Sequence, residues 1–215
     1  APLTAVRWSA EGLLKSVTDV KAHLETAKVK DSMTTIDLAA TNMLELVNDL
    51  LDVAKIEAGK FDLNIQEYDV VASIKEQIKA FEPQATAKHL VINYIGPDKQ
   101  MVKFDRVRIS QVITNLLSNS IKYTDSGQID LSVALEEKDK RVVVSIKDSG
   151  IGVSREDLSV LFSKFKQLKT FDSSRKGTGL GLVVSKGIVE AHGGQIWAES
   201  AGENLGSTFY FSLPL

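Results

Sequence analysis

The stretch that decides the fold class is RVVVSIKDSGIGV, residues 141–153, in which a run of β-branched residues leads directly into a glycine-rich loop. Valine and isoleucine favour a strand, and Asp148 stands at its end. Gly150 and Gly152 free the backbone for close approach to a ligand. An ionised carboxylate only accepts hydrogen bonds, so Asp148 suits the recognition of an exocyclic amine such as that of adenine. Taken alone, the D-x-G-x-G pattern also fits an ordinary turn.

Around this strand, short β-rich runs and helical stretches mix without regular βαβ alternation in the chain after Gly59. Helices are expected near residues 70–87, 105–123 and 180–192. Strands are expected in FDLNIQEYD (61–69), HLVINYI (89–95), QIDLSVAL (128–135), RVVVSIKD (141–148), GQIWAES (194–200) and STFYFSL (207–213). The predicted fold class for residues 59–215 is therefore α+β, a sandwich in which helices cover one face of a mixed sheet.

Residues 1–58 have a different period, because their apolar residues recur at alternating steps of three and four, as in helices that pack in a bundle. The second of two such seams runs unbroken across Asp31 and Ser32, so a turn is expected between Ser16 and Leu24. The prediction is a helical hairpin with a shorter helix and then a longer one. The two seams are Leu3, Val6, Ala10, Leu13 and Val17, followed by Val29, Met33, Ile36, Ala40, Met43, Val47, Leu50 and Ala54.

The longer helix also carries Leu44, Leu46, Leu51 and Val53 beside its seam, which is a wider apolar stripe than one partner helix can cover. Pairing two hairpins into a four-helix bundle would cover it. We therefore predict a homodimer through residues 1–58. The alternative is that the second domain covers this stripe.

A polar helix face is expected in RISQVITNLLSNSIKYT, residues 108–124. Asn115 and Asn119 are four residues apart and share a face, and Lys122 and Tyr123 follow one turn later. An amide oxygen suits Mg²⁺ when a bound triphosphate already supplies negative charge. Asparagines on a helix are, on the other hand, usually just solvated.

Two further segments complete the pattern. FSKFKQLKTFDSSRK (162–176) is basic and contains Phe162, Phe165 and Phe171, which fits either a mobile lid anchored by its aromatic residues or a plain surface loop. GTGLGLVVSKGIVEAHGG (177–194) places three glycines before a helix, where backbone N–H groups can hold phosphates. The latter is not a Walker loop, because no G-K-S or G-K-T follows, and it lacks the Rossmann spacing.

The order and spacing of these four segments resemble the ATP-binding domain of histidine kinases, within the GHKL superfamily shared with gyrase and heat-shock chaperone ATPases. LVNDLLDVAKIEAGKFDL (46–63) resembles the end of the HisKA-type dimerisation hairpin, and VEAHGGQIWAES and GSTFYFSLP resemble the closing strands of the ATP-binding domain. The resemblance covers essentially the whole chain. It implies the catalytic core of a sensor histidine kinase, which transfers the γ-phosphoryl group of ATP to a histidine for relay to a response regulator receiver domain.

The resemblance also implies ATP and Mg²⁺ as cofactors, with a role for each matching residue. Asn119 would coordinate Mg²⁺, and Asn115 would line the phosphate side of the same helix. Lys122 would approach the phosphates, while Tyr123 would flank the adenine. Asp148 would accept the adenine amine above a floor shaped by the two glycines that follow it.

The remaining implied contacts come from the lid and the glycine-rich segment. Lys166, just after Phe165, stands where the family often has arginine, and it keeps the charge for the γ-phosphate but loses the bidentate fork. The catalytic residues implied are then Asn115, Lys122 and Lys166. The phosphates would be wrapped by Gly177, Thr178, Gly179, Leu180 and Gly181.

The start of the chain departs from the family pattern, in which the first helix opens with histidine and glutamate, two further residues, threonine or asparagine, and then proline. Residues 1–5, APLTA, match only the tail of that pattern, so the acceptor histidine is expected just before Ala1. His23 lies near the expected turn and His89 opens a strand. His192 belongs to the HGG turn and is most simply structural.

Composition excludes several other classes of protein. A net charge of −2 gives no electrostatic reason to expect nucleic acid or a membrane surface as partner, and no run of about 18 apolar residues exists. The absence of cysteine excludes disulfides and thiolate chemistry. A cytoplasmic location is expected for these residues, and membrane anchoring of a longer full-length protein stays open. The alternatives are a non-catalytic ATP-responsive dimeric scaffold, another GHKL ATPase, or a serine kinase of the anti-sigma type. The long hairpin disfavours the last two.

Overall fold

The computed structural model describes residues 8–12, 26–164, 166 and 178–215, and the chain divides into two compact units, residues 1–51 and 52–215. The division falls inside α2, Thr26–Glu57, which is one continuous helix. The predicted continuity across Asp31 and Ser32 is thereby confirmed. Residues 8–12 are also helical, but the predicted turn and most of the first seam lie outside the described residues.

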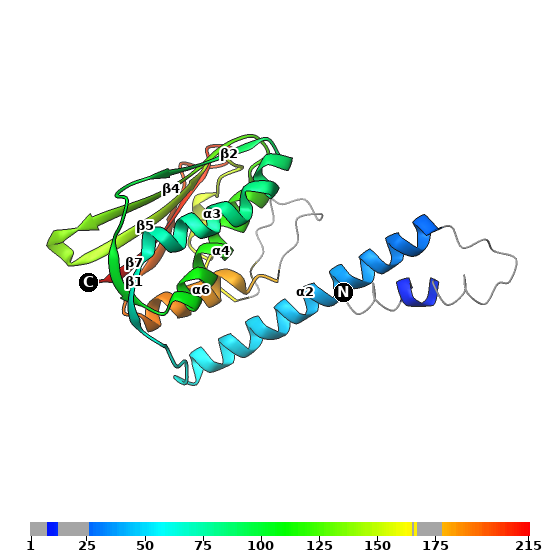
Figure 1. The fold of residues 1–215 in the computed structure, drawn as a ribbon, viewed down its shortest axis with the longest axis horizontal. Coiled ribbons are helices and arrows are strands. Elements are labelled where there is room, and N and C mark those ends of the chain that lie inside the picture. Colours follow the sequence, from blue (N-terminus) through cyan, green and yellow to red (C-terminus); the bar gives the residue numbers. More distant parts are fainter. Residues whose placement is uncertain (1–7, 13–25, 165, 167–177) are drawn as a thin grey trace, which may run out of the picture. The chain divides into compact units, whose positions relative to one another are not determined.

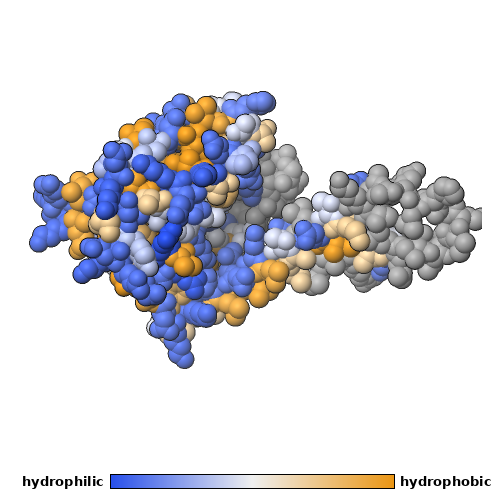
Figure 2. All heavy atoms as spheres, in the orientation of Figure 1, coloured by the Kyte–Doolittle hydropathy of each residue, from blue (hydrophilic) through white to orange (hydrophobic). Residues whose placement is uncertain are grey.

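The first unit contains an apolar helix face that the described residues leave open. Five large apolar side chains of α2 are between 41% and 66% exposed, and hydrophobic residues are visible along this helix in Figure 2. No helix in the described part of the chain is long and apolar enough to cross a bilayer. The exposed side chains of α2 are Met33, Leu44, Val47, Leu50 and Leu51.

The second unit is built on a five-stranded sheet with the strand order β2-β4-β5-β7-β6. The pair β2–β4 is parallel and the other pairs are antiparallel, so the sheet is mixed, as predicted. A short 3₁₀ turn, Glu137–Asp139, joins β4 to β5. The strands are β2, Leu90–Ile95; β4, Gly127–Glu136; β5, Arg141–Asp148; β6, Ile196–Glu199; and β7, Ser207–Pro214.

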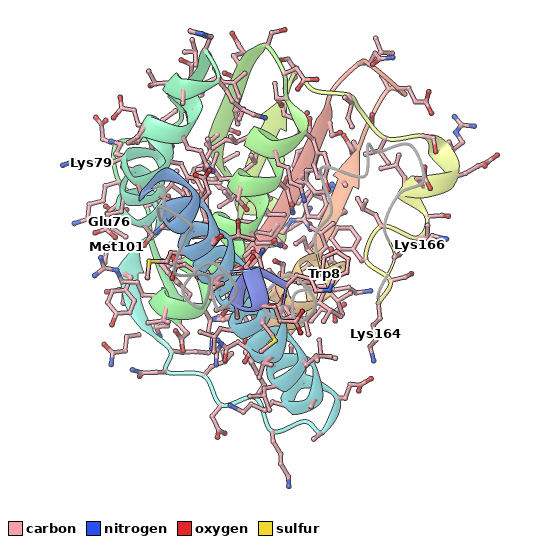
Figure 3. All side chains as sticks on the ribbon, turned by 90° about the vertical axis from the view of Figure 1, so that its right-hand side faces the viewer. Trp8, Glu76, Lys79, Met101, Lys164 and Lys166 are labelled. Atoms are coloured by element: carbon pink, nitrogen blue, oxygen red, sulfur yellow. The ribbon has the colours of Figure 1, made fainter. Side chains whose placement is uncertain are left out.

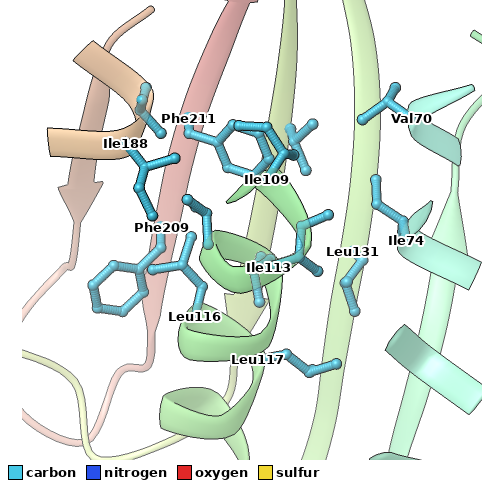
Figure 4. Close-up of a cluster of buried hydrophobic side chains, with 14 of the residues drawn as sticks. Val70, Ile74, Ile109, Ile113, Leu116, Leu117, Leu131, Ile188, Phe209 and Phe211 are labelled. Carbon is cyan, nitrogen blue, oxygen red and sulfur yellow. The ribbon is translucent and has the colours of Figure 1, made fainter. Parts of the chain in front are cut away.

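Three helices cover one face of this sheet (Figure 1), namely α3, Val70–Ala87, α4, Arg106–Tyr123, and α6, Gly181–Ala191. They agree closely with the helices predicted from the sequence. The core lies between them and the sheet, where fully buried residues of α4 meet side chains from α3, α6, β4 and β7 (Figure 4). Helical spacing explains the α4 contribution, because residues three and four apart share one face. These α4 residues are Ile109, Ile113, Leu116 and Leu117.

The prediction of a strand over residues 61–69 was too long. Only Gln66–Asp69 forms a strand, β1, and it pairs antiparallel with β3, Met101–Phe104, in a separate two-stranded sheet. β3 was not predicted from the sequence, because its alternation covers only Val102 and Phe104, which are the two buried residues of the strand. Two alternations are too few to distinguish a strand from a loop.

The last residues of α2 belong to the second unit and pack on its helices. The buried carboxylate of Asp52 accepts hydrogen bonds from Arg108 Nη1 at 3.0 Å and from Gln111 Nε2 at 3.1 Å. The side chain of Ile56 lies directly against Gly187 of α6. The end of α2 is therefore fixed to the first turns of α4 and to the middle of α6.

Candidate nucleotide-binding site

The C-terminal half of α4 carries four of the predicted site residues, and all of them are half-buried. Asn119 Nδ2 donates to Asn115 Oδ1 at 3.4 Å, and Asn115 Nδ2 donates to Ser185 Oγ on α6 at 2.8 Å. Lys122 Nζ lies 5.1 Å from the centre of the Tyr123 ring. The two amides thus form a short chain of hydrogen bonds that links α4 to α6.

Asp148 is the last residue of β5, and its carboxylate is buried. Its Oδ1 accepts hydrogen bonds from the backbone N–H groups of Gly150, at 2.9 Å, and Ser207, at 3.3 Å. Burial raises the pKa of Asp148, whereas these two N–H groups favour the ionised form and act in the opposite direction. The Ser120 hydroxyl has the same lowering effect on the pKa, although its Oγ has no hydrogen bond of normal geometry within the described residues.

The D-x-G-x-G loop is packed between the end of α4 and the turn before β7. A Cβ atom on Gly150 would collide with the backbone oxygen of Tyr123, and one on Gly152, which has φ +68°, would collide with that of Gly202. Gly206 N also donates to Gly150 O at 3.0 Å. Protein atoms fill the space in which a side chain at Gly150 or Gly152 would lie. Close packing between α4 and β7 is thus what requires glycine here.

The start of α6 lies directly against α4. A Cβ atom on Gly181, the first residue of α6, would lie 2.5 Å from Asn115 Oδ1. Before it, Gly179 has φ +72°, and the N–H of the buried Leu180 is bound by the Thr178 hydroxyl at 3.2 Å. Four of the five predicted phosphate-wrapping residues therefore lie on a short segment that reaches Asn115.

The expected lid is described only in part. Phe165, Phe171 and Gly177 lie outside the described residues, whereas Phe162 is half-buried against the core. Lys166 is exposed, and its backbone N–H donates to Ser163 O at 3.4 Å. Figure 3 shows the side chains of Lys164 and Lys166 on the segment after α5, Arg155–Leu158. The contacts of Lys166 do not connect it with the asparagines of α4.

The donor set indicates how a magnesium ion would be held. No cluster of three or more histidine, aspartate or glutamate side chains suited to a metal occurs within the described ranges. Asn119 directs its Nδ2 toward Asn115, so its amide oxygen is the atom of this side chain that is suited to a metal. Mg²⁺ typically takes one or two protein ligands together with substrate phosphates and water. The residues present therefore fit an ion that arrives with a polyphosphate, and not a metal held by protein groups alone.

Two neighbours of this site were not predicted from the sequence. Ser185, which binds Asn115, stands four residues after Gly181 and so on the same face of α6, a spacing that could have revealed it. Lys88 Nζ donates to three backbone oxygens at the end of α4, the nearest being Ile121 O at 2.7 Å. Lysine side chains often bind the last carbonyl groups of a helix. Lys88 follows α3 in the sequence, however, and no sequence pattern indicates that it binds the carbonyl groups of α4.

Known proteins share this sequence and fold. Residues 104–215, about half of the chain, match the family described as histidine kinase-, DNA gyrase B-, and HSP90-like ATPase. Hybrid signal transduction histidine kinase C of Dictyostelium discoideum is 34% identical over 98% of this chain and 18% of its own length. The chain spans about a fifth or less of the first curated relatives that it matches.

Solved structures agree in fold. Histidine kinase AdeS of Acinetobacter baumannii superposes with a TM-score of 0.78 at 26% identity, over 100% of this chain and 95% of AdeS. Histidine kinase ThkA, in a complex with the response regulator protein TrrA, has a TM-score of 0.69 at 23% identity, over 99% of this chain and 58% of ThkA. The likeness to AdeS extends over both units of the chain.

Proposed function

Because the chain belongs to the histidine kinase-, DNA gyrase B-, and HSP90-like ATPase family, we propose that it is the ATP-binding catalytic core of a sensor histidine kinase. The observation that carries this proposal is the placement of Asp148. Its buried carboxylate is fixed through Oδ1 by two backbone N–H groups, in a loop packed against the end of α4. A fixed acceptor beside a helix with linked asparagines suits a ligand with an amine at one end and phosphates at the other.

Asp148 binds the base of the nucleotide. The carboxylate accepts a hydrogen bond from the adenine amine, which guanine lacks at the corresponding position. Tyr123, at the end of α4, flanks the base. Gly150 and Gly152 hold the loop in place by close packing.

The phosphates are bound by residues of α4 and of the segment before α6. Asn115 lines their path, and Lys122 and Lys166 supply positive charge. When bound, Mg²⁺ on Asn119 would neutralise charge on the β- and γ-phosphates. The glycine-rich segment 177–181 would wrap the phosphates, because it leads into the N-terminus of α6, whose first N–H groups lack intrahelical partners.

The reaction is transfer of the γ-phosphoryl group to a histidine of the full-length protein. A ring nitrogen of the histidine forms a P–N bond, while the bond between the γ-phosphorus and the bridging oxygen breaks and its electrons stay on ADP. Catalysis of this kind depends on positioning and charge neutralisation. The phosphoryl group then passes to an aspartate of a response regulator receiver domain.

Two protein partners belong to the proposal. The exposed apolar face of α2 supports a homodimer through residues 1–58, in which two hairpins form a four-helix bundle. A response regulator partner is supported by the names of the relatives, which are histidine kinases, and by the fold shared with ThkA, which was solved with TrrA.

Titration calorimetry with Mg-ATP and Mg-GTP tests the site through Asp148→Asn. An amide presents a donor where the carboxylate only accepts, so we expect the preference for ATP to fall by about tenfold, equivalent to about 1.4 kcal/mol. Asp130→Asn is the control, because Asp130 lies on the neighbouring strand and binds Asn93 and Gln128. An unchanged preference in Asp148→Asn would remove this residue from base recognition. Acid-labile labelling of the full-length protein by ATP tests the kinase step.

A further inference from the structure

The C-terminal end of α4 is held by a lysine from another helix. The chain leaves α4 through Thr124 in an extended conformation, with φ −108° and ψ 122°, and the last carbonyl groups of a helix need partners outside its own ladder. Lys88 Nζ donates to the backbone oxygens of Ile121 at 2.7 Å and of Lys122 and Thr124 at 3.3 Å each. Its positive charge also interacts favourably with the negative, C-terminal end of the dipole of α4. The last turn of α4 is therefore bound to the end of α3.

Backbone hydrogen bonds fix the position of Lys88 at the C-terminal end of α3. It is the C-cap residue of α3, and its N–H donates to the carbonyl groups of Ala85 and Thr86. The next residue, His89, has a left-handed φ of 57°, and its N–H donates to Thr86 O at 2.9 Å. β2 begins one residue later and pairs with β4. The position of the ammonium group is thus set by α3 and the sheet.

A second contact holds the same turn from the D-x-G-x-G loop. Ile151 N donates to Tyr123 O at 3.2 Å, the carbonyl that lies between those bound by Lys88. Lys88 and Ile151 together therefore bind the backbone oxygens of residues 121–124. Displacement of this turn would change the spacing between Asp148, at the head of the loop, and Asn119 on α4.

From these contacts we infer that Lys88 is a positioning residue for Mg-ATP, whose ammonium group sets the spacing between Asp148 and the phosphate-side residues of α4. The inference rests on the proposed nucleotide site. Lys88 acts through α4 without touching the nucleotide. Its removal should therefore weaken a ligand that spans both ends of the site, such as Mg-ATP, more than adenosine, which meets only the base-recognition end.

The test compares the parent chain with Lys88→Met and Lys88→Arg at a temperature where circular dichroism shows all three to be folded. Methionine has a similar length but no donor, whereas arginine keeps the charge and several donors. We expect Lys88→Met to bind Mg-ATP about tenfold more weakly by calorimetry, with little change in adenosine binding by NMR titration. Lys88→Arg should recover most of the lost affinity.

Two controls separate positioning from stability. Lys75→Met removes another α3 lysine, which pairs with Asp98 at 3.9 Å. Ile74→Val removes a buried methylene from α3 and so lowers the stability of the domain without touching Lys88 or α4's carbonyl groups. Both variants should bind Mg-ATP as the parent does. Parent-like affinity in Lys88→Met, or an equal loss of affinity in Ile74→Val, would overturn the inference.

Amide hydrogen exchange gives a readout that needs no nucleotide. The Ile151 amide should exchange several-fold faster in Lys88→Met, because its acceptor lies in the released turn, and should be unchanged in Lys75→Met. An unchanged rate overturns the inference even if the parent binds Mg-ATP. A parent that fails to bind Mg-ATP contradicts the proposed function, and the exchange rate then still decides whether Lys88 fixes this turn. If Lys88→Met does not fold, Lys88→Gln takes its place, and parent-like binding and exchange in that variant overturn the inference.

Discussion

At the scale of single residues, His192 joins two helices of the ATP-binding domain. It is the C-cap residue of α6 and is buried. Its Nε2 accepts a hydrogen bond from the backbone N–H of Asp105 at 3.0 Å, and its Nδ1 lies 2.7 Å from Ile188 O. This pair of bonds requires a neutral ring with its proton on Nδ1. Because Asp105 is the N-cap of α4, the imidazole connects the end of α6 to the start of α4.

This contact predicts that the stability of the domain falls on mild acidification. Burial lowers the pKa of His192, and the Ile188 carbonyl and the charge of Asp105 only partly oppose this effect. The unfolded chain binds a proton near the ordinary pKa of about 6.5, whereas the folded chain binds it only at lower pH. The free energy of unfolding should therefore decrease as the pH falls below about 6.5, and be unaffected by this group well above it.

Urea unfolding at pH 7.5 and pH 5.5 checks this expectation. His192→Gln keeps an acceptor for the Asp105 N–H but does not titrate, so its stability should change less between the two pH values than that of the parent. His89→Asn is the matched control, because it removes an exposed imidazole from a left-handed position that asparagine tolerates. The same pH dependence in the parent and in His192→Gln would show that this ring does not cause it.

The site residues differ in how far the sequence can predict them. The spacing of Asn115 and Asn119 places them on one helix face, and the valine-rich strand places Asp148 at its end. Lys88 and His192 could not be placed in this way. Their partners lie 33 and 87 residues away along the chain, and only the packing of α3 and α6 against α4 brings them together.

At the scale of elements, the D-x-G-x-G loop is fixed by backbone contacts on two sides, and this predicts a large cost for Gly150→Ala. The added methyl group would meet the Tyr123 carbonyl, Asp148 Oδ1 and Thr124 Oγ1. A backbone carbonyl at a helix end cannot move without moving α4, so we expect a loss of about 1–3 kcal/mol in the free energy of unfolding. Urea unfolding measures this loss.

Gly187→Ala provides the comparison within the same unit. The three atoms nearest to its methyl group would all belong to the Ile56 side chain, which can change rotamer, and alanine favours a helix over glycine by about 1 kcal/mol. Its loss of stability should therefore be smaller than that of Gly150→Ala. The reverse order would contradict the packing assigned to the loop.

The elements also show where periodicity stops being informative. The helices α3, α4 and α6 each contain several turns of one apolar face, so the sequence predicts their limits to within about two residues. β3 has only four residues, and its pairing with β1 is a long-range contact that no local pattern encodes. The sequence also does not show which protein atoms lie beside Gly150 and Gly152, so their close packing against Tyr123 and Gly202 could not be predicted.

At the scale of the whole molecule, α2 extends from the first unit into the second. Its last residues are bound within the ATP-binding domain through Asp52, while Val47 and Leu50, in the predicted seam, are more than 40% exposed. Leaving such side chains in water costs about 1.5–3 kcal/mol each. A partner that covers this face would remove that cost.

The proposed homodimer makes a prediction about mass. Light scattering should give twice the chain mass of 23.5 kDa, and Val47→Glu should separate the subunits or unfold the hairpin, because a buried unpaired carboxylate is costly. Asn48→Glu is the matched control. It places the same charge one residue along the helix, at an exposed position outside the seam, so it should leave the mass unchanged. A folded, monodisperse monomer in the parent protein would contradict the dimer, and equal dissociation in both variants would mean that net charge, and not burial of the seam, separates the subunits.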